Sequence, residues 1–143
     1  MSRNTIIKPN KPLYRPKNYH LWMKVKARLH NEVVEYAPYR EGEVYWFCIG
    51  DNIGTEEDGK NEVFSRPVVI VRGFSRTLVW GVPLSHTKNT GPYYHEFEFK
   101  GEISNALLSQ LRSFDLARAT SDCIGVVKRK ELSVIRRKLK MLL

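Results

Sequence analysis

Arg66-Pro67-Val68-Val69-Ile70-Val71 is the stretch that decides the fold of this 143-residue chain. Four consecutive β-branched residues follow an arginine and a proline, and a short continuous apolar run of this kind is typical of a buried strand. Arg66 stands at the start of that strand, where its planar guanidinium can bind a phosphate through two parallel hydrogen bonds. We therefore expect a functional role for Arg66.

Further strand-like segments lie on both sides of this run. They are rich in Val, Tyr, Trp and Phe, or alternate apolar with polar residues. We expect strands at 43–49, 67–72, 77–84, 93–99, 107–112 and 123–127. Their aromatic residues Trp46, Phe47 and Trp80 are expected in the core. This pattern predicts a mostly β (α+β) fold, namely a small SH3-like β-barrel with a C-terminal helix and an extra N-terminal helix.

The two helices are predicted by apolar residues at helical spacing. Asn18 is a good cap for a helix over 19–36, and Pro38 ends that pattern. Its apolar stripe, which includes Trp22 and Val25, is expected to pack on the body. Near the C-terminus the apolar face consists of Leu132, Ile135, Leu139 and Leu142.

The formal net charge of +9 is unevenly distributed. Residues 1–40 carry 9 Lys+Arg and 2 Asp+Glu, residues 41–127 carry 8 and 12, and residues 128–143 carry 7 and 1. The basic excess therefore lies at the two ends, where it favours an accessory grip on RNA or a surface for an acidic partner. A functional site in the acidic middle of the chain is therefore expected to depend on a few individual groups such as Arg66.

Several classes of protein are not expected from this composition. No run of 18 apolar residues predicts a membrane span, and residues 1–10 lack the apolar core of a secretory signal. Cys48 and Cys123 form neither a CxxC motif nor a Cys/His cluster, which argues against zinc and against a disulfide framework. We expect no metal, no cofactor, no membrane association and a cytoplasmic location.

Five strings occur in a characteristic order from residue 42 onward. They are GEVYW at 42–46, NIGTEEDGK at 52–60, RPVVIV at 66–71, WGVPLS at 80–85 and LSQLRSFD at 108–115. Together they resemble the MazF/PemK-like toxins of type II toxin–antitoxin systems. The resemblance predicts a toxin domain at 41–143, preceded at 1–40 by a basic arm and an amphipathic helix that minimal family members lack.

The resemblance implies a specific activity. Most such toxins are homodimeric, metal-independent endoribonucleases that cleave single-stranded mRNA at short sequences. The 2′-hydroxyl attacks the adjacent phosphorus and leaves a 2′,3′-cyclic phosphate and a 5′-hydroxyl. A cognate antitoxin with an acidic segment neutralises them. The chain is thus expected to be a cytoplasmic mRNA interferase.

The resemblance also assigns candidate site residues. Arg66 matches the catalytic arginine of the family, and Ser85 stands where a catalytic threonine is common. His86, Thr87 and Gln110 are possible catalytic or substrate-binding groups. The long loop 51–65 is expected to cover the site and select the RNA sequence, through Thr55, Glu56 and Lys60.

Two alternatives remain open at this point. Where some relatives carry an Arg and an Asp as an acid/base pair, this chain has Leu107 and Ser109, which puts that version of the mechanism in doubt. The chain could be an inactive RNA-binding relative. It could also be a non-nuclease toxin that binds a protein target, as the CcdB-like proteins do on the same barrel.

Overall fold

The computed structural model describes residues 15–32, 35 and 37–143. The strand predicted from RPVVIV is β2 (Ser65–Gly73), and it lies between β1 (Glu43–Cys48) and β3 (Leu78–Ser85). Its central residues Val68, Val69 and Ile70 are fully buried. The run of β-branched residues is therefore the centre of the sheet, as the sequence predicts.

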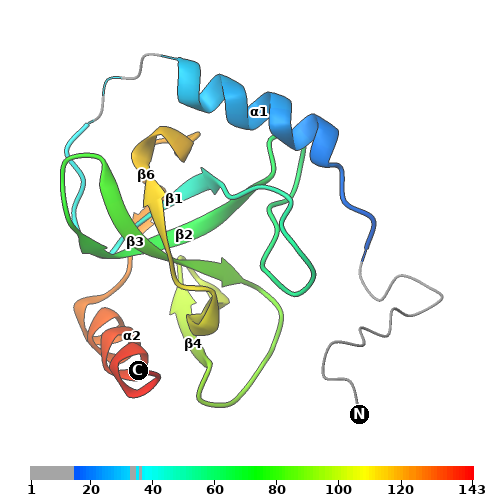
Figure 1. Cartoon of the computed structure of the whole chain (residues 1–143). Helices are drawn as coiled ribbons and strands as arrows, with labels where there is room; N and C mark the ends of the chain where they lie inside the picture. Colours follow the sequence, from blue (N-terminus) through cyan, green and yellow to red (C-terminus); the bar gives the residue numbers. More distant parts are fainter. Residues whose placement is uncertain (1–14, 33–34, 36) are drawn as a thin grey trace, which may run out of the picture.

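β3 is the strand at which the sheet divides. Its first half pairs with β6 (Arg112–Asp115), and its last two residues pair with β5 (Glu102–Leu107). β4 (Tyr94–Phe99) extends the sheet beyond β5, and β7 (Gly125–Val126) pairs with β1. All these pairs are antiparallel. Because β5 and β6 pair with different parts of β3, the sheet splits there and curls into a half-barrel (Figure 1). The predicted mostly β fold is confirmed.

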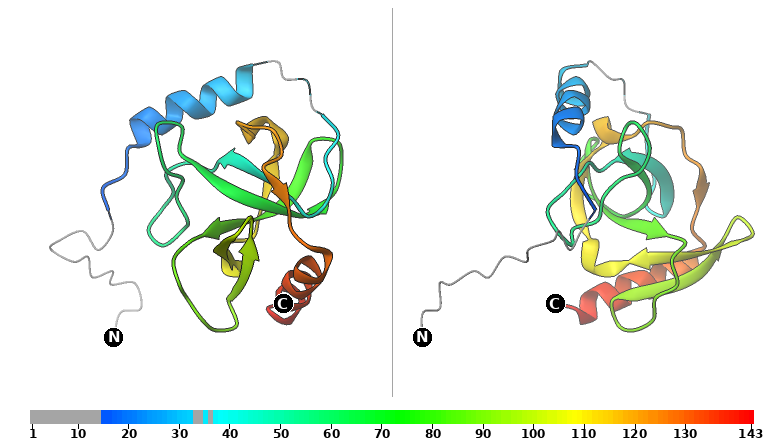
Figure 2. Two further views of the ribbon diagram at one scale, coloured as in Figure 1. Left: turned by 180° about the vertical axis from the view of Figure 1, so that it is seen from behind. Right: turned by 90° about the vertical axis from the view of Figure 1, so that its right-hand side faces the viewer.

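Two helices lie at opposite ends of the half-barrel (Figure 2). α2 (Arg129–Met141) places Leu132 and Ile135 in the main core cluster, as predicted. α1 (Tyr19–Asn31) begins after Asn18, whose side chain accepts a hydrogen bond from the backbone N–H of Leu21. In the described part of the chain no helix is long and apolar enough to cross a membrane.

α1 packs on the sheet through its own small cluster. Trp22 and Val25 are buried with Cys48 at the end of β1 and Phe64 just before β2. The rings of Trp22 and Phe64 meet edge to face, 5.6 Å between centroids. The N-terminal helix is therefore an integral part of the core and not an appendage.

Two predicted segments end differently in the structure. The helix predicted over 19–36 ends at Asn31, and positions 33, 34 and 36 lie outside the described residues. The strand predicted over 107–112 is wrong, because a 3₁₀ helix, η1 (Leu108–Gln110), separates the end of β5 from β6. A second such turn, η2 (Leu116–Arg118), follows β6. Of the two leucines that suggested this strand, Leu107 is the last residue of β5 and Leu108 is the first residue of η1.

The tryptophans of the sheet are not in the core, contrary to the prediction. Trp46 and Trp80 are 36% and 43% exposed, whereas Phe47 is fully buried. Successive side chains in a strand point to opposite faces, so the inward Phe47 requires an outward Trp46. The same alternation places Trp80 outside, where its ring meets Phe74 edge to face.

Candidate active site

A cavity of about 230 Å³ lies where the start of β2 meets the end of β3. Four of the residues predicted at the site line it, namely Lys60, Arg66, Ser85 and His86. Trp46 and Lys100 also line it, and the sequence did not indicate either at this place. The cavity thus brings together basic side chains, a serine hydroxyl and an indole ring.

Arg66 is the central cation of this cavity. Its side chain is only 9% exposed and forms an ion pair with the Glu57 carboxylate at 2.7 Å. Its Nε donates to the backbone carbonyl of Asp58 at 2.9 Å, and its Nη1 donates to that of Leu84 at 3.4 Å. These contacts use three of the five N–H groups of a guanidinium and leave two for a ligand. The side chain is thus held at three points and keeps two N–H groups that these contacts do not use.

Ser85 ends β3 beside Arg66 in the cavity lining. Its hydroxyl oxygen accepts a hydrogen bond from the backbone N–H of Thr87 at 3.1 Å. That contact uses a lone pair and leaves the hydroxyl hydrogen available to donate. Thr87 itself does not line the cavity, and its backbone N–H is the group that contacts Ser85.

His86 is exposed at the edge of the cavity. Its Nδ1 lies 3.1 Å from the backbone carbonyl of Ile103, and its Nε2 lies 3.7 Å from the Glu102 carboxylate. A carbonyl only accepts, so Nδ1 carries the hydrogen in this contact. In the neutral ring Nε2 is then the nitrogen able to accept a proton.

Gln110 holds the long loop and does not line the cavity. Its side-chain oxygen accepts from the backbone N–H of Glu57 at 3.0 Å, and its side-chain amide donates to the carbonyl of Thr55 at 3.2 Å. Glu56 is used locally, since its carboxylate accepts from the N–H of Ile53. Of the three loop residues predicted to bind RNA, only Lys60 reaches the cavity in this structure.

The sequence did not indicate three contacts that hold the site residues in place. Glu57 and Asp58 belong to the loop expected to cover the site, and both contact Arg66. Asn105 is buried opposite Ser85, and its amide donates at 3.2 Å to the carbonyls of Thr87 and Asn89. It thereby fixes the turn that follows Ser85. No sequence signal marked it, because β5 was not predicted.

The positions that depart from the acid/base pattern are now located. Leu107 is buried at the end of β5, and Ser109 lies in η1. Neither lines the cavity of Arg66. An acid/base pair at these two positions is therefore not part of this chain.

Comparison with known families agrees with this arrangement. Residues 40–143 match the family model described as "PemK-like, MazF-like toxin of type II toxin-antitoxin system". The chain belongs to this family. The resemblance predicted from the five strings is thus confirmed, and the match begins after the described part of the N-terminal segment, residues 15–32.

Solved structures share the toxin fold. MazF from Deinococcus radiodurans is 20% identical, with a TM-score of 0.57, over 78% of this chain and 97% of that chain. A mycobacterial endoribonuclease in complex with its cognate antitoxin is 20% identical, with a TM-score of 0.53, over 73% and 93%. The MazE–MazF structure from D. radiodurans is 18% identical, with a TM-score of 0.50, over 78% and 96%. No curated protein matches the chain.

Proposed function

We propose that this toxin is a sequence-specific, metal-independent endoribonuclease that cleaves single-stranded mRNA. The observation that carries the proposal is the convergence of Arg66, Ser85 and His86 on one cavity. RNA cleavage by the neighbouring 2′-hydroxyl needs charge stabilisation at phosphorus and two proton transfers, and side chains of these types supply both. Family membership and an endoribonuclease among the solved structures support the assignment.

In the proposed reaction, Arg66 binds the scissile phosphate through its two remaining donors and stabilises the charge that develops on the phosphorane. The hydroxyl of Ser85 donates to another phosphate oxygen. Nε2 of His86 accepts the proton of the 2′-hydroxyl as the 2′-oxygen attacks phosphorus. The bond from phosphorus to the 5′-oxygen breaks, and that oxygen takes a proton from water, leaving a cyclic phosphate and a 5′-hydroxyl. The proton on His86 then neutralises the hydroxide, which restores the free imidazole and the water.

The substrate class follows from the surroundings of the cavity. Lys60 and Lys100 line it and can attract neighbouring phosphates, and the half-exposed indole of Trp46 can stack on an unpaired base. Sequence-specific RNA recognition depends on bases that are free of a helix. We therefore propose single-stranded mRNA as the substrate. On the basis of family membership and of relatives solved with their antitoxins, we also propose a homodimer as the active form and an antitoxin with an acidic segment as the inhibitor.

The activity is tested by incubating the full chain with a long single-stranded RNA in EDTA. We expect cuts at one short recurring sequence, and no cuts when the same RNA is first annealed to its complement. Stable binding of RNA without any cleavage would contradict the proposal and favour the inactive RNA-binding alternative. Absence of both binding and cleavage would favour the protein-binding alternative.

Replacement of Ser85 tests its role separately. Ser85→Ala removes the hydroxyl that donates to the phosphate, so we expect the cleavage rate to fall about 10²-fold. Ser85→Thr keeps a hydroxyl at this position and should retain most of the rate. The measurement is single-turnover cleavage of a short RNA that contains the preferred sequence. Equal rates for the Ala and Thr variants would show that the hydroxyl has no catalytic role.

A further inference from the structure

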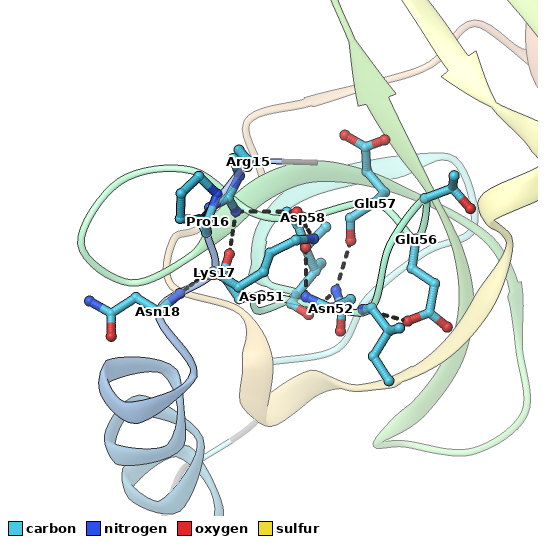
Figure 3. Close-up of polar contacts among 12 residues, drawn as sticks. Arg15, Pro16, Lys17, Asn18, Asp51, Asn52, Glu56, Glu57 and Asp58 are labelled. Atoms are coloured by element: carbon cyan, nitrogen blue, oxygen red, sulfur yellow. Dashed lines mark hydrogen bonds and ion pairs between the residues drawn. The ribbon is translucent and has the colours of Figure 1, made fainter. Parts of the chain in front are cut away.

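The described part of the N-terminal segment runs directly along the loop that carries Glu57 and Asp58 (Figure 3). Arg15 forms an ion pair with Asp51, and Lys17 Nζ lies 2.5 Å from the Asp58 carboxylate. The backbone N–H of Asn18 donates to the other oxygen of Asp51 at 2.6 Å. The basic segment thus meets the acidic loop through complementary charges.

Asp58 connects this contact to the candidate active site. One carboxylate oxygen faces Lys17, and the other accepts from the backbone N–H of Asn52 at 2.6 Å. The backbone carbonyl of the same residue accepts from Nε of Arg66 at 2.9 Å. Asp58 thus contacts Lys17 through its carboxylate and Arg66 through its backbone carbonyl.

These ion pairs are partly shielded from water. The side chain of Lys17 is only 9% exposed, and that of Asp51 is not exposed at all. Burial disfavours the charged form of Asp51, but the hydrogen bonds from Arg15 and Asn18 outweigh it and lower the pKa of that carboxyl. Asp58 faces both Lys17 and, at 3.2 Å, Arg15. Loss of either cation removes part of the compensation of this shielded carboxylate.

α1 fixes the segment at its other end. Gly50, at the start of the loop, has φ +94°, and a Cβ there would lie 2.4 Å from the indole of Trp22. Only glycine avoids this overlap, so the loop and the helix fit each other closely. The hydroxyl of Tyr19 also donates to the backbone carbonyl of Asn52 at 2.8 Å. Charged, aromatic and backbone contacts all join the segment to the same loop.

We propose that residues 15–31 form an intramolecular clasp that holds the loop in the conformation required by Arg66. In the clasp, Lys17 and Arg15 are positioning residues and are not RNA-binding residues. Their cationic groups are directed at Asp51 and Asp58, so these two residues do not serve as the accessory RNA grip considered for the basic arm. The consequence for catalysis rests on the proposed nuclease activity, whereas the structural coupling does not.

The kinetic test compares Lys17→Ala with Lys24→Ala in the full chain. Lys24 lies on the exposed side of α1, so its replacement removes the same charge from the same segment without touching the loop. We expect Lys17→Ala to lower kcat for RNA cleavage about tenfold with KM changed less than twofold, because small misplacements of reacting groups are costly. Lys24→Ala should match the wild type, and Lys17→Arg should restore most of kcat. A rise in KM alone, equal in both alanine variants, would overturn the clasp in favour of an RNA grip.

Amide hydrogen exchange without RNA tests the coupling independently of activity. We expect Lys17→Ala to accelerate exchange at the amides of Asn52 and Glu57 at least tenfold, while those of Val69 and Val82 in the central strands keep the wild-type rate. Unchanged exchange in the loop would overturn the clasp even if the protein cleaves RNA. If the wild type cleaves no RNA, the proposed function fails, and the exchange result alone decides whether the clasp exists. Faster loop exchange with unchanged kcat would overturn its link to Arg66.

Discussion

Arg66→Ala should reduce RNA cleavage by about 10²–10³-fold, the effect expected when one preorganised donor to a developing negative charge is removed. The substitution takes away the two N–H groups left for the phosphate and the ion pair with Glu57. Single-turnover cleavage at saturating RNA measures the loss. A smaller loss is expected for Arg66→Lys, which keeps the charge without the paired donors of a guanidinium.

Folding has to be controlled in this experiment because Arg66 is buried. Its replacement leaves the Glu57 carboxylate and the carbonyl of Asp58 without their partner. Thermal unfolding followed by circular dichroism shows whether each variant is folded at the assay temperature. A folded Arg66→Ala variant with the wild-type cleavage rate would remove Arg66 from the mechanism.

Trp22→Ala should lower the free energy of unfolding by about 3–5 kcal/mol, as large-to-small substitutions of buried aromatic residues do. Trp22 is buried against Phe64 and against the open face of Gly50, so its removal leaves a cavity between α1 and the sheet. Urea unfolding gives the change in free energy from the midpoint and the slope.

Met23→Ala is the matched control for this prediction. Met23 is adjacent in the same helix but is exposed, so its replacement should change the free energy of unfolding by no more than about 0.5 kcal/mol. Equal small effects of the two substitutions would show that α1 is not part of the core. In that case the contact of residues 15–18 with the loop would lose its support.

The strands with a strong apolar pattern could be predicted from the sequence, whereas β5 and β6 could not. β2 was predicted because four consecutive β-branched residues favour a buried strand over a helix or a loop. β5 was missed because it buries Ser104 and Asn105, polar residues that a pattern of hydrophobicity assigns to a loop. The amide of Asn105 donates to the turn after Ser85, a contact that no local sequence pattern indicates.

Four residues that line the cavity were named from the sequence, but the sequence did not indicate their contacts. Arg66 and Ser85 were both expected and lie at the same cavity. Gln110 was considered for RNA binding, yet it contacts a backbone group 53 positions away in the sequence. Such long-range contacts leave no local trace in the sequence, and neither does the pairing of Lys17 with Asp58.

The distribution of charge takes on a clearer meaning in the structure. The middle of the chain is acidic partly because its loop supplies Asp51 and Asp58 to the N-terminal segment. At the other end, Arg136 pairs with Glu41, and Lys138 donates to the carbonyl of Tyr94. Part of the basic excess at both ends therefore stabilises the fold instead of binding a polyanion.

The chemistry of the cut ends tests the central claim most directly. RNA fragments produced by the full chain in EDTA are examined for the groups at their new termini. Attack by the 2′-hydroxyl predicts a 5′-hydroxyl, which polynucleotide kinase labels without prior phosphatase treatment, and a 2′,3′-cyclic phosphate on the other fragment. Fragments with 5′-phosphate ends, or cleavage that EDTA abolishes, would contradict the proposed mechanism.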